Sequence, residues 1–314
     1  MSIKKMTFLE EQAYKIENDW LSVIVMPSEG ANLISIYHKG KNVEILRTPS
    51  SKEERDARKT LYGTPVLFPP NRIDHAQFEF DGRTYHLEMN RAKEDCHIHG
   101  FVNDKPWQVK NIDPAHNCLV LELRSEDHPS IMKQFPHEFI MQMTIQLSEN
   151  EVTQSLVIKN RGDLAMPVGL GYHTTFHFPI QSSTLQIELG DQWELNDRHM
   201  PTERFIKDLF ADELKKGARL FGKVLDNIYK MTNNKTATLS IPDNGLEIKY
   251  TADGPFTQWV VFTSDGESDF VAIEPYTWVT NAPNLSLPEE ETGMNSLKPG
   301  EMITCMTTFK IDSI

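Results

Sequence analysis

Short segments in which apolar and polar residues alternate recur along most of this chain, and Gly, Asn, Asp or Pro bound them. Alternation with period two is typical of strands with one buried face, so the pattern favours an all-β fold. Phe139 to Leu147 alternates and returns after a short polar turn as Val152 to Ile158, which predicts an antiparallel pair. Phe78 to Phe80 and Thr84 to Leu87 flank Asp81-Gly82, a dipeptide that tolerates the positive φ angles of a tight hairpin turn. Further strands are predicted at Leu119 to Leu123, Thr238 to Ile241, Leu246 to Tyr250, Trp259 to Phe262 and Ile303 to Ile311.

Helical periodicity is confined to two segments. The stretch from Thr202 to Lys216 places apolar residues on one helical face after Pro201, and a short polar helix is expected to begin at Ser51, with Glu54 completing a capping box. Neither helix is long enough to anchor a parallel sheet, and neither a dinucleotide nor a P-loop glycine motif is present. A chain of 314 residues is long enough for two domains, but it contains no linker and no repeat. We therefore expect a single large antiparallel β-sandwich domain over residues 1–314, with a few short helices.

The charge balance excludes some partners. Lys and Arg number 32 against 45 Asp and Glu, a formal net charge of −13, which disfavours binding to nucleic acid. No apolar stretch approaches the roughly 18 residues of a membrane span, and the N-terminus lacks the apolar region of a secretory signal. Three scattered cysteines, Cys96, Cys118 and Cys305, cannot make a disulfide framework and are expected to be free, buried or half-buried residues. A cytoplasmic location fits these features best.

Four clusters place polar residues in predicted strands that are otherwise apolar, where burying them is costly unless they serve a purpose. They contain Arg72, the pair His97 and His99, His173, and Glu274. Two of these residues have an ordinary structural alternative. Arg72 could be a surface ion-pair residue, and His173 could be a structural residue of a glycine-flanked turn. Glu274, between Ile and Pro, is harder to explain structurally, because a buried carboxylate needs partners or a function.

The segment His97-Ile98-His99 also allows a metal pair, since alternate strand positions face the same way and His is a common zinc ligand. A third protein ligand is needed, and no motif supplies one. A hydrogen-bonding role for one of the histidines is the favoured interpretation, and no metal or other cofactor is expected.

Taken together and in order, these clusters resemble the aldose 1-epimerase (mutarotase) family over most of the chain. The matching segments are Asn71-Arg72-Ile73, His97 to Gly100 with Trp107, Gly171 to Phe176, Leu225-Asp226-Asn227, Ile273-Glu274-Pro275 with Asn281 to Asn284, and Leu297 to Glu301. Two segments differ from the commonest galactose mutarotases: Phe101 follows Gly100 in place of a second glycine, and the His173 motif reads Tyr172-His173-Thr174-Thr175-Phe176-His177. The resemblance implies a galactose mutarotase-like sandwich in a divergent branch, with the sugar specificity open.

The resemblance also implies roles for single residues. Glu274 would be the general base and His173 the general acid that open and close a sugar's hemiacetal ring, a reaction without metal or redox cofactor. Arg72, His99 and Asp226 would hold the sugar, and His97 is the less favoured histidine. A carboxylate and an imidazole suit this work because their ordinary pKa values, about 4.3 and 6.5, bracket mildly acidic pH. Four aromatic residues are candidate walls of the site but are more often core: Trp107, Phe176, Tyr276 and Trp278.

Three other functions stay open. A non-catalytic carbohydrate-binding protein would not need an opposed acid and base. A mutarotase for phosphorylated sugars would bring several basic residues to the site, for which Arg91, Lys93 and Arg198 are the candidates. A glycoside hydrolase would use two carboxylates, Asp226 and Glu274. Neither the natural sugar nor the oligomeric state follows from the sequence.

Overall fold

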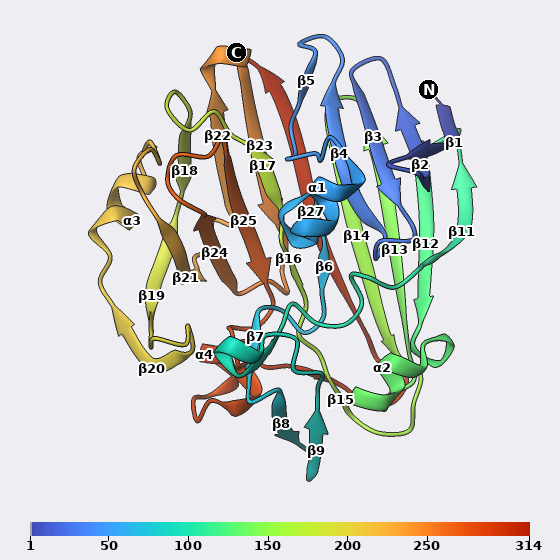
Figure 1. Cartoon of the computed structure of the whole chain (residues 1–314), viewed down its shortest axis with the longest axis vertical. Coiled ribbons are helices and arrows are strands. Elements are labelled where there is room, and N and C mark those ends of the chain that lie inside the picture. Colours follow the sequence, from blue (N-terminus) through green and yellow to red (C-terminus); the bar gives the residue numbers. More distant parts are fainter. Residues whose placement is uncertain (1) are drawn as a thin grey trace.

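The computed structural model describes residues 2–314 and consists mainly of antiparallel sheets with four short α-helices (Figure 1). A five-stranded sheet is formed by the N-terminal part of the chain, with strands β1 Ser2–Phe8, β2 Glu11–Glu17, β3 Leu21–Met26, β4 Asn32–His38 and β5 Val43–Glu44. The helices are α1 Lys52–Ala57, α2 Pro129–Gln134, α3 Leu209–Leu214 and α4 Glu289–Thr292, with 3-10 turns at Lys59–Leu61, Ala92–Glu94, Ser125–Asp127, Pro242–Asn244 and Ala282–Asn284.

Two larger sheets follow. The first is eight-stranded, in the order β11 Gln108–Asp113, β12 Cys118–Arg124, β13 Phe139–Ser148, β14 Glu151–Asn160, β27 Met302–Ser313, β23 Leu246–Ala252, β22 Thr236–Ile241 and β18 Thr184–Ile187. The second runs in the order β20 Pro201–Ile206, β19 Leu189–Leu195, β21 Leu225–Met231, β24 Gln258–Thr263, β25 Phe270–Tyr276, β16 Gly171–Tyr172 and β6 Val66–Leu67, and β17 Thr175–His177 also pairs with β25. Three two-stranded pairs complete the fold: β7 Arg72–Asp74 with β10 Cys96–Ile98, β8 Gln77–Phe80 with β9 Arg83–His86, and β15 Met166–Pro167 with β26 Ser296–Leu297.

The alternation that predicted the strands also builds the core. Every second residue of β13 and β14 is buried, and one large apolar cluster draws on all three larger sheets, as Val23, Leu121 and Val271 illustrate. The predicted all-β class, the hairpin at Asp81-Gly82 and the pair β13–β14 are confirmed. The three cysteines are free, and Cys118 alone of them is half-buried.

The two helix predictions had different outcomes. Helix α1 begins after Ser51, whose side chain accepts a 3.1 Å hydrogen bond from the Glu54 amide, as expected of an N-cap. The helix expected over Thr202 to Lys216 is wrong for its first half. Residues Pro201–Ile206 form β20, paired with β19, and only α3 is helical. The pairing of Phe205 opposite Trp193, with ring centroids 4.5 Å apart, gives that segment a sheet partner that sequence periodicity does not reveal.

Candidate active site

The register of the second large sheet brings two of its carboxylates, Asp226 and Glu274, to one face. Asp226 lies opposite Phe262, which lies opposite Ala272, and in the next row Val260 lies opposite Glu274. Residues directly opposite on paired strands share a face, as do residues two apart on one strand. The other face carries Val261 and the rest of the main core, so Asp226, Phe262 and Glu274 share the face turned away from it.

Glu274 is buried in the middle of β25, all seven residues of which are buried. Burial raises the pKa of its carboxyl to about 8, the hydrogen bond donated by the Tyr276 hydroxyl to Oε2 lowers it, and the nearby charge of Asp226 raises it further. Tyr276 follows Glu274 by two residues on the same face. Gly171 on the neighbouring strand makes room for the ring, since a Cβ there would lie 2.3 Å from Tyr276 Cδ1.

His173 directly follows β16, where its amide donates a 3.1 Å hydrogen bond to the Pro65 carbonyl. Its Nε2 lies 3.4 Å from Glu274 Oε1, and both side chains are nearly inaccessible to solvent. Burial lowers the pKa of the imidazole to about 4. Burial thus disfavours the charged form of both partners, and the pair holds a single proton between pH values near those two pKa values.

Arg72 is the first residue of β7, and His99 directly follows β10. Arg72 is opposite Ile98, its Nε pairs with Glu94 at 2.8 Å, and its Nη1 donates to the Asn71 side-chain oxygen at 3.1 Å. The sequence left open that Arg72 is a surface ion-pair residue. It does form an ion pair, but it is buried and lines a pocket.

His99 leaves the strand with a φ of 64°, and its amide donates a 2.9 Å hydrogen bond to the Asn71 carbonyl. It therefore does not share one strand face with His97, and within residues 2–314 no three His, Cys, Asp or Glu side chains gather as a metal-ligand set. Gly100 holds this turn: its φ is +71°, and a Cβ would lie 2.2 Å from the Phe68 carbonyl oxygen.

These elements enclose a pocket of about 440 Å³, within the usual range for small-molecule sites. All five residues predicted from the sequence line it: Arg72, His99, His173, Asp226 and Glu274. Asp226 is the most exposed of the carboxylates there and lies 3.4 Å from His199 Nδ1. The His99 and His173 rings meet edge to face with centroids 5.3 Å apart.

The family model for aldose 1-epimerase matches residues 12–310. The chain belongs to the aldose 1-epimerase family. It is similar to the Escherichia coli protein YphB, with 24% identity over 261 residues, 79% of this chain and 83% of YphB. A solved galactose mutarotase-like protein from Clostridium acetobutylicum has 25% identity and a TM-score of 0.92, covering 100% of this chain and 99% of that one. The galactose 1-epimerase of Lactobacillus acidophilus has the same fold, with 18% identity, a TM-score of 0.78 and 99% of each chain covered. The match confirms the resemblance and the galactose mutarotase-like fold.

Two aromatic residues of this aldose 1-epimerase family member have roles that the sequence did not predict. Phe262, rather than Trp107, Phe176 or Trp278, supplies the aromatic wall of the pocket. Tyr276 is buried beneath Glu274 as its hydrogen-bond donor. Only the register of β24 with β25 places Phe262 there, and the sequence does not give that register. Tyr276 shares its face with Glu274 because it lies two residues further along β25.

The basic residues differ from expectation as well. Arg91 lines the pocket and Arg58, which the sequence did not single out, lines it too. Arg198 is engaged by Asp74 and by the carbonyl oxygens of Glu94 and Asp95, and neither it nor Lys93 lines the pocket. No helix of residues 2–314 is both long and apolar enough to cross a membrane.

Proposed function

We propose that this protein is an aldose 1-epimerase that interconverts the α and β anomers of a free hexose or a related sugar. The observation that carries the proposal is the contact of Glu274 Oε1 with His173 Nε2 at 3.4 Å in the wall of a pocket of about 440 Å³. Between the two pKa values the pair holds one proton, and a pair that can both accept and donate a proton is what acid and base catalysis requires. The family match supports an isomerase of this type.

The proposed reaction opens and closes the hemiacetal ring. The Glu274 carboxylate removes the proton from the C1 hydroxyl, the O–H electron pair forms the C1 carbonyl, and the C1–O5 bond breaks with its electrons going to O5. O5 takes a proton from the His173 imidazolium. After rotation about C1–C2, the steps run in reverse on the other face of the carbonyl, so no net proton is consumed.

The reactive form of the pair holds its one proton on His173, whereas burial favours the neutral form with the proton on Glu274. The two forms have the same proton count and differ by one transfer across the 3.4 Å contact. The positive charge of Arg72 lowers the pKa of Glu274 and so favours the carboxylate form. Sugar hydroxyls that donate to the carboxylate act in the same direction.

The remaining residues would orient the sugar. The Arg72 guanidinium donates to hydroxyl or ring oxygens, Asp226 accepts from hydroxyls, and His99 forms a hydrogen bond through its ring. Burial and the nearby His173 hold the pKa of His99 well below its ordinary value, so its ring is neutral. A fixed pose matters because the base must meet O1 and the acid O5 at the same time.

Polarimetry of freshly dissolved α-D-glucose and α-D-galactose tests the proposal. Wild type should equilibrate at least one of them faster than buffer, and Glu274→Gln and His173→Asn should each lose about 10²–10⁴-fold in rate. A protein that binds sugar without accelerating mutarotation would be the binding module instead. Hydrolysis of an aryl glycoside that disappears in both Asp226→Asn and Glu274→Gln would favour the hydrolase.

A second candidate function is the mutarotation of a phosphorylated hexose. Arg58, Arg72 and Arg91 all line the pocket, and within residues 2–314 Arg58 forms no ion pair. Guanidinium groups are suited to binding phosphate. Competition between glucose and its 6-phosphate separates the two candidates, because only a phosphate-preferring site gives the phosphorylated sugar the lower KM.

A further inference from the structure

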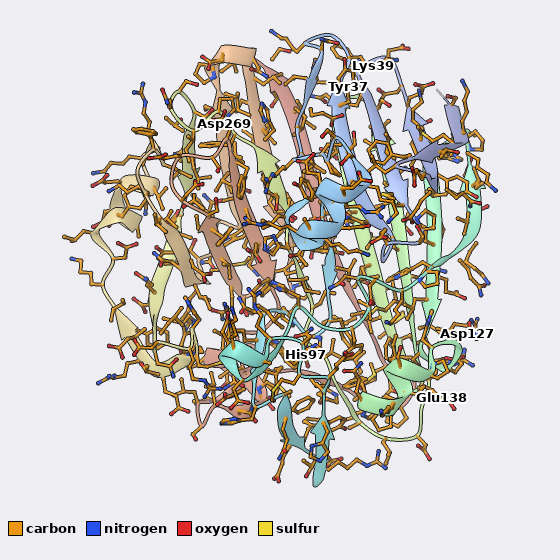
Figure 2. All side chains as sticks on the ribbon, viewed as in Figure 1. Tyr37, Lys39, His97, Asp127, Glu138 and Asp269 are labelled. Atoms are coloured by element: carbon orange, nitrogen blue, oxygen red, sulfur yellow. The ribbon has the colours of Figure 1, made fainter. Side chains whose placement is uncertain are left out.

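A histidine outside the pocket contacts one of the pocket's carboxylates. His99 and His173 line the candidate active site, whereas His97, labelled in Figure 2, is buried on β10 and does not line it. A fourth histidine, His199, reaches the site from another element: its Nδ1 lies 3.4 Å from Asp226 Oδ2. Asp226 lines the pocket and His199 does not, so His199 can act on a bound sugar only through that carboxylate.

The contact with His199 is what holds the Asp226 carboxylate. Within residues 2–314, His199 is its only hydrogen-bond or ion-pair partner, although the Asp226 side chain is only 34% exposed. A carboxylate oxygen can only accept, so the favoured His199 carries a hydrogen on Nδ1, as it does in one neutral tautomer and in the charged ring. With Oδ2 engaged in this way, Oδ1 is left to accept from a ligand.

The turn that carries His199 holds its backbone in one conformation. It connects β19 to β20, and the Asn196 side-chain oxygen accepts hydrogen bonds from the amides of Arg198 at 2.9 Å and Met200 at 3.1 Å. The His199 amide donates to the Asn196 carbonyl at 2.8 Å, and the φ of His199 is 58°. Such a left-handed conformation is uncommon for a residue with a side chain, and the surrounding hydrogen bonds of the turn maintain it.

Arg198, the residue before His199, fastens the turn to the small sheet β7–β10. Its guanidinium pairs with Asp74, the last residue of β7, and donates to the carbonyl oxygens of Glu94 at 3.2 Å and Asp95 at 3.0 Å. The first residue of β7 lines the pocket. The position of the imidazole is therefore fixed relative to the pocket wall from which a sugar would be bound.

We propose that His199 is a positioning residue that keeps the Asp226 carboxylate in the orientation in which it accepts a hydrogen bond from a sugar hydroxyl. This inference rests on the proposed function. Neither residue is the proposed acid or base, so the contribution belongs to substrate binding rather than to proton transfer. It is therefore expected in KM and not in kcat.

Two substitutions at position 199 separate the hydrogen-bond donor from the backbone. Glycine and asparagine both adopt the left-handed conformation readily, but only the asparagine amide can donate to Asp226. The substrate is whichever of glucose, galactose and glucose 6-phosphate the wild type converts fastest. We expect His199→Gly to raise KM about twofold to fivefold with kcat unchanged, since a pair of partly exposed side chains contributes modestly. His199→Asn should keep KM near the wild-type value.

A control and a double variant complete the test. His116→Ala removes another exposed imidazole, 2.7 Å from Asp113 in the turn between β11 and β12 and outside the pocket, and should change neither KM nor kcat. In the Asp226→Ala background, His199→Gly should raise KM no further, because the carboxylate that it positions is gone. Independent increases in KM would overturn the proposal. So would a His199→Asn variant as impaired as His199→Gly, a loss confined to kcat, or an unchanged KM.

If the wild type converts none of the three sugars, the proposed function fails, and calorimetric titration with the same sugars then decides the role of His199. A dissociation constant that His199→Gly raises about twofold to fivefold and His199→Asn leaves unchanged would support the positioning of Asp226. Equal affinity in the three proteins, or absence of binding, would contradict it.

Discussion

The one proton shared by Glu274 and His173 makes the activity depend on pH in a specific way. Below about pH 4 both groups are protonated and no base is available, and above about pH 8 neither holds the proton and no acid is available. We expect a bell-shaped profile of kcat/KM with limbs near these values and a plateau between them. Polarimetry across pH 3.5–10, corrected for the buffer reaction, measures the profile. An activity that keeps rising through pH 9 would contradict it.

Tyr276 acts on the reaction through Glu274. Its hydroxyl donates to the carboxylate and so lowers the pKa of Glu274. In Tyr276→Phe that pKa should rise, and the alkaline limb of the profile should move to higher pH. Because burial would then hold the proton on Glu274 more strongly, the plateau rate should fall about tenfold or more, the typical cost of over 1 kcal/mol of lost stabilisation.

A purely structural role for Tyr276 predicts something different. The variant would lose thermal stability and active fraction, while the limbs of the profile would stay where they are in wild type. Thr175→Ser, which keeps the hydroxyl 3.4 Å from His173 Nδ1, is a mild control on the other side of the pair and should leave both limbs unchanged.

The polar residues of the site were predictable one by one, but their neighbours were not. Glu274 and His173 stand out because they interrupt apolar segments of predicted strands, where burying a charge is costly. Arg58 follows an exposed polar helix, and nothing around it in the sequence distinguishes it from the other charged residues of that helix. Phe262 resembles any core aromatic, since only pairing with a distant strand places it opposite Asp226.

The turn from His99 to Gly100 follows β10 and places His99 in the wall of the pocket. Gly100→Ala should destabilise the protein by roughly 3 kcal/mol or more and displace His99, because the new Cβ meets the Phe68 carbonyl oxygen at 2.2 Å. Gly82→Ala is a matched control: its φ is also +71°, but no atom lies within 4 Å of the new Cβ. The control should lose only about 1 kcal/mol, the cost of the left-handed backbone alone.

Thermal unfolding of both variants measures the difference, and sugar KM reports the position of His99. Equal losses of stability in the two alanine variants would mean that backbone conformation, rather than the close approach to Phe68, requires glycine at position 100.

Strand elements with a buried face were predicted well, because their alternation is local. The wrong helix prediction at Pro201–Ile206 arose because a non-local pairing decides the structure of that segment. Its apolar residues also satisfy a helical spacing, and the pairing with β19 that decides between the two structures depends on Trp193. Likewise, the alternation does not indicate which strands become neighbours, as the adjacency of β14 and β27 shows. Such pairings between distant segments bring Arg72, Asp226 and Glu274 to one pocket, and a single sequence contains no direct record of them.

The net charge of the whole molecule and the arginines of the pocket act on an anionic ligand in opposite directions. A net charge of −13 repels anions at long range, whereas Arg58, Arg72 and Arg91 converge on the pocket. At physiological ionic strength the Debye length is about 8 Å, so charges at the pocket act more strongly on a ligand than distant carboxylates. Glu94 pairs with both Arg72 and Arg91, which leaves Arg58 as the lining arginine without an ion pair within residues 2–314.

If the natural substrate is phosphorylated, Arg58→Ala should raise KM for glucose 6-phosphate about twofold to fivefold and leave KM for glucose unchanged, since one exposed charge contributes about 1 kcal/mol or less. Lys59→Ala removes the neighbouring positive charge, which pairs with Glu29 and lies outside the pocket, and should change neither value. Raising the salt concentration should weaken only the binding of the phosphorylated sugar. A KM that rises equally for both sugars in Arg58→Ala would show that this arginine supports the pocket wall rather than a phosphate, and a neutral sugar would then be the substrate.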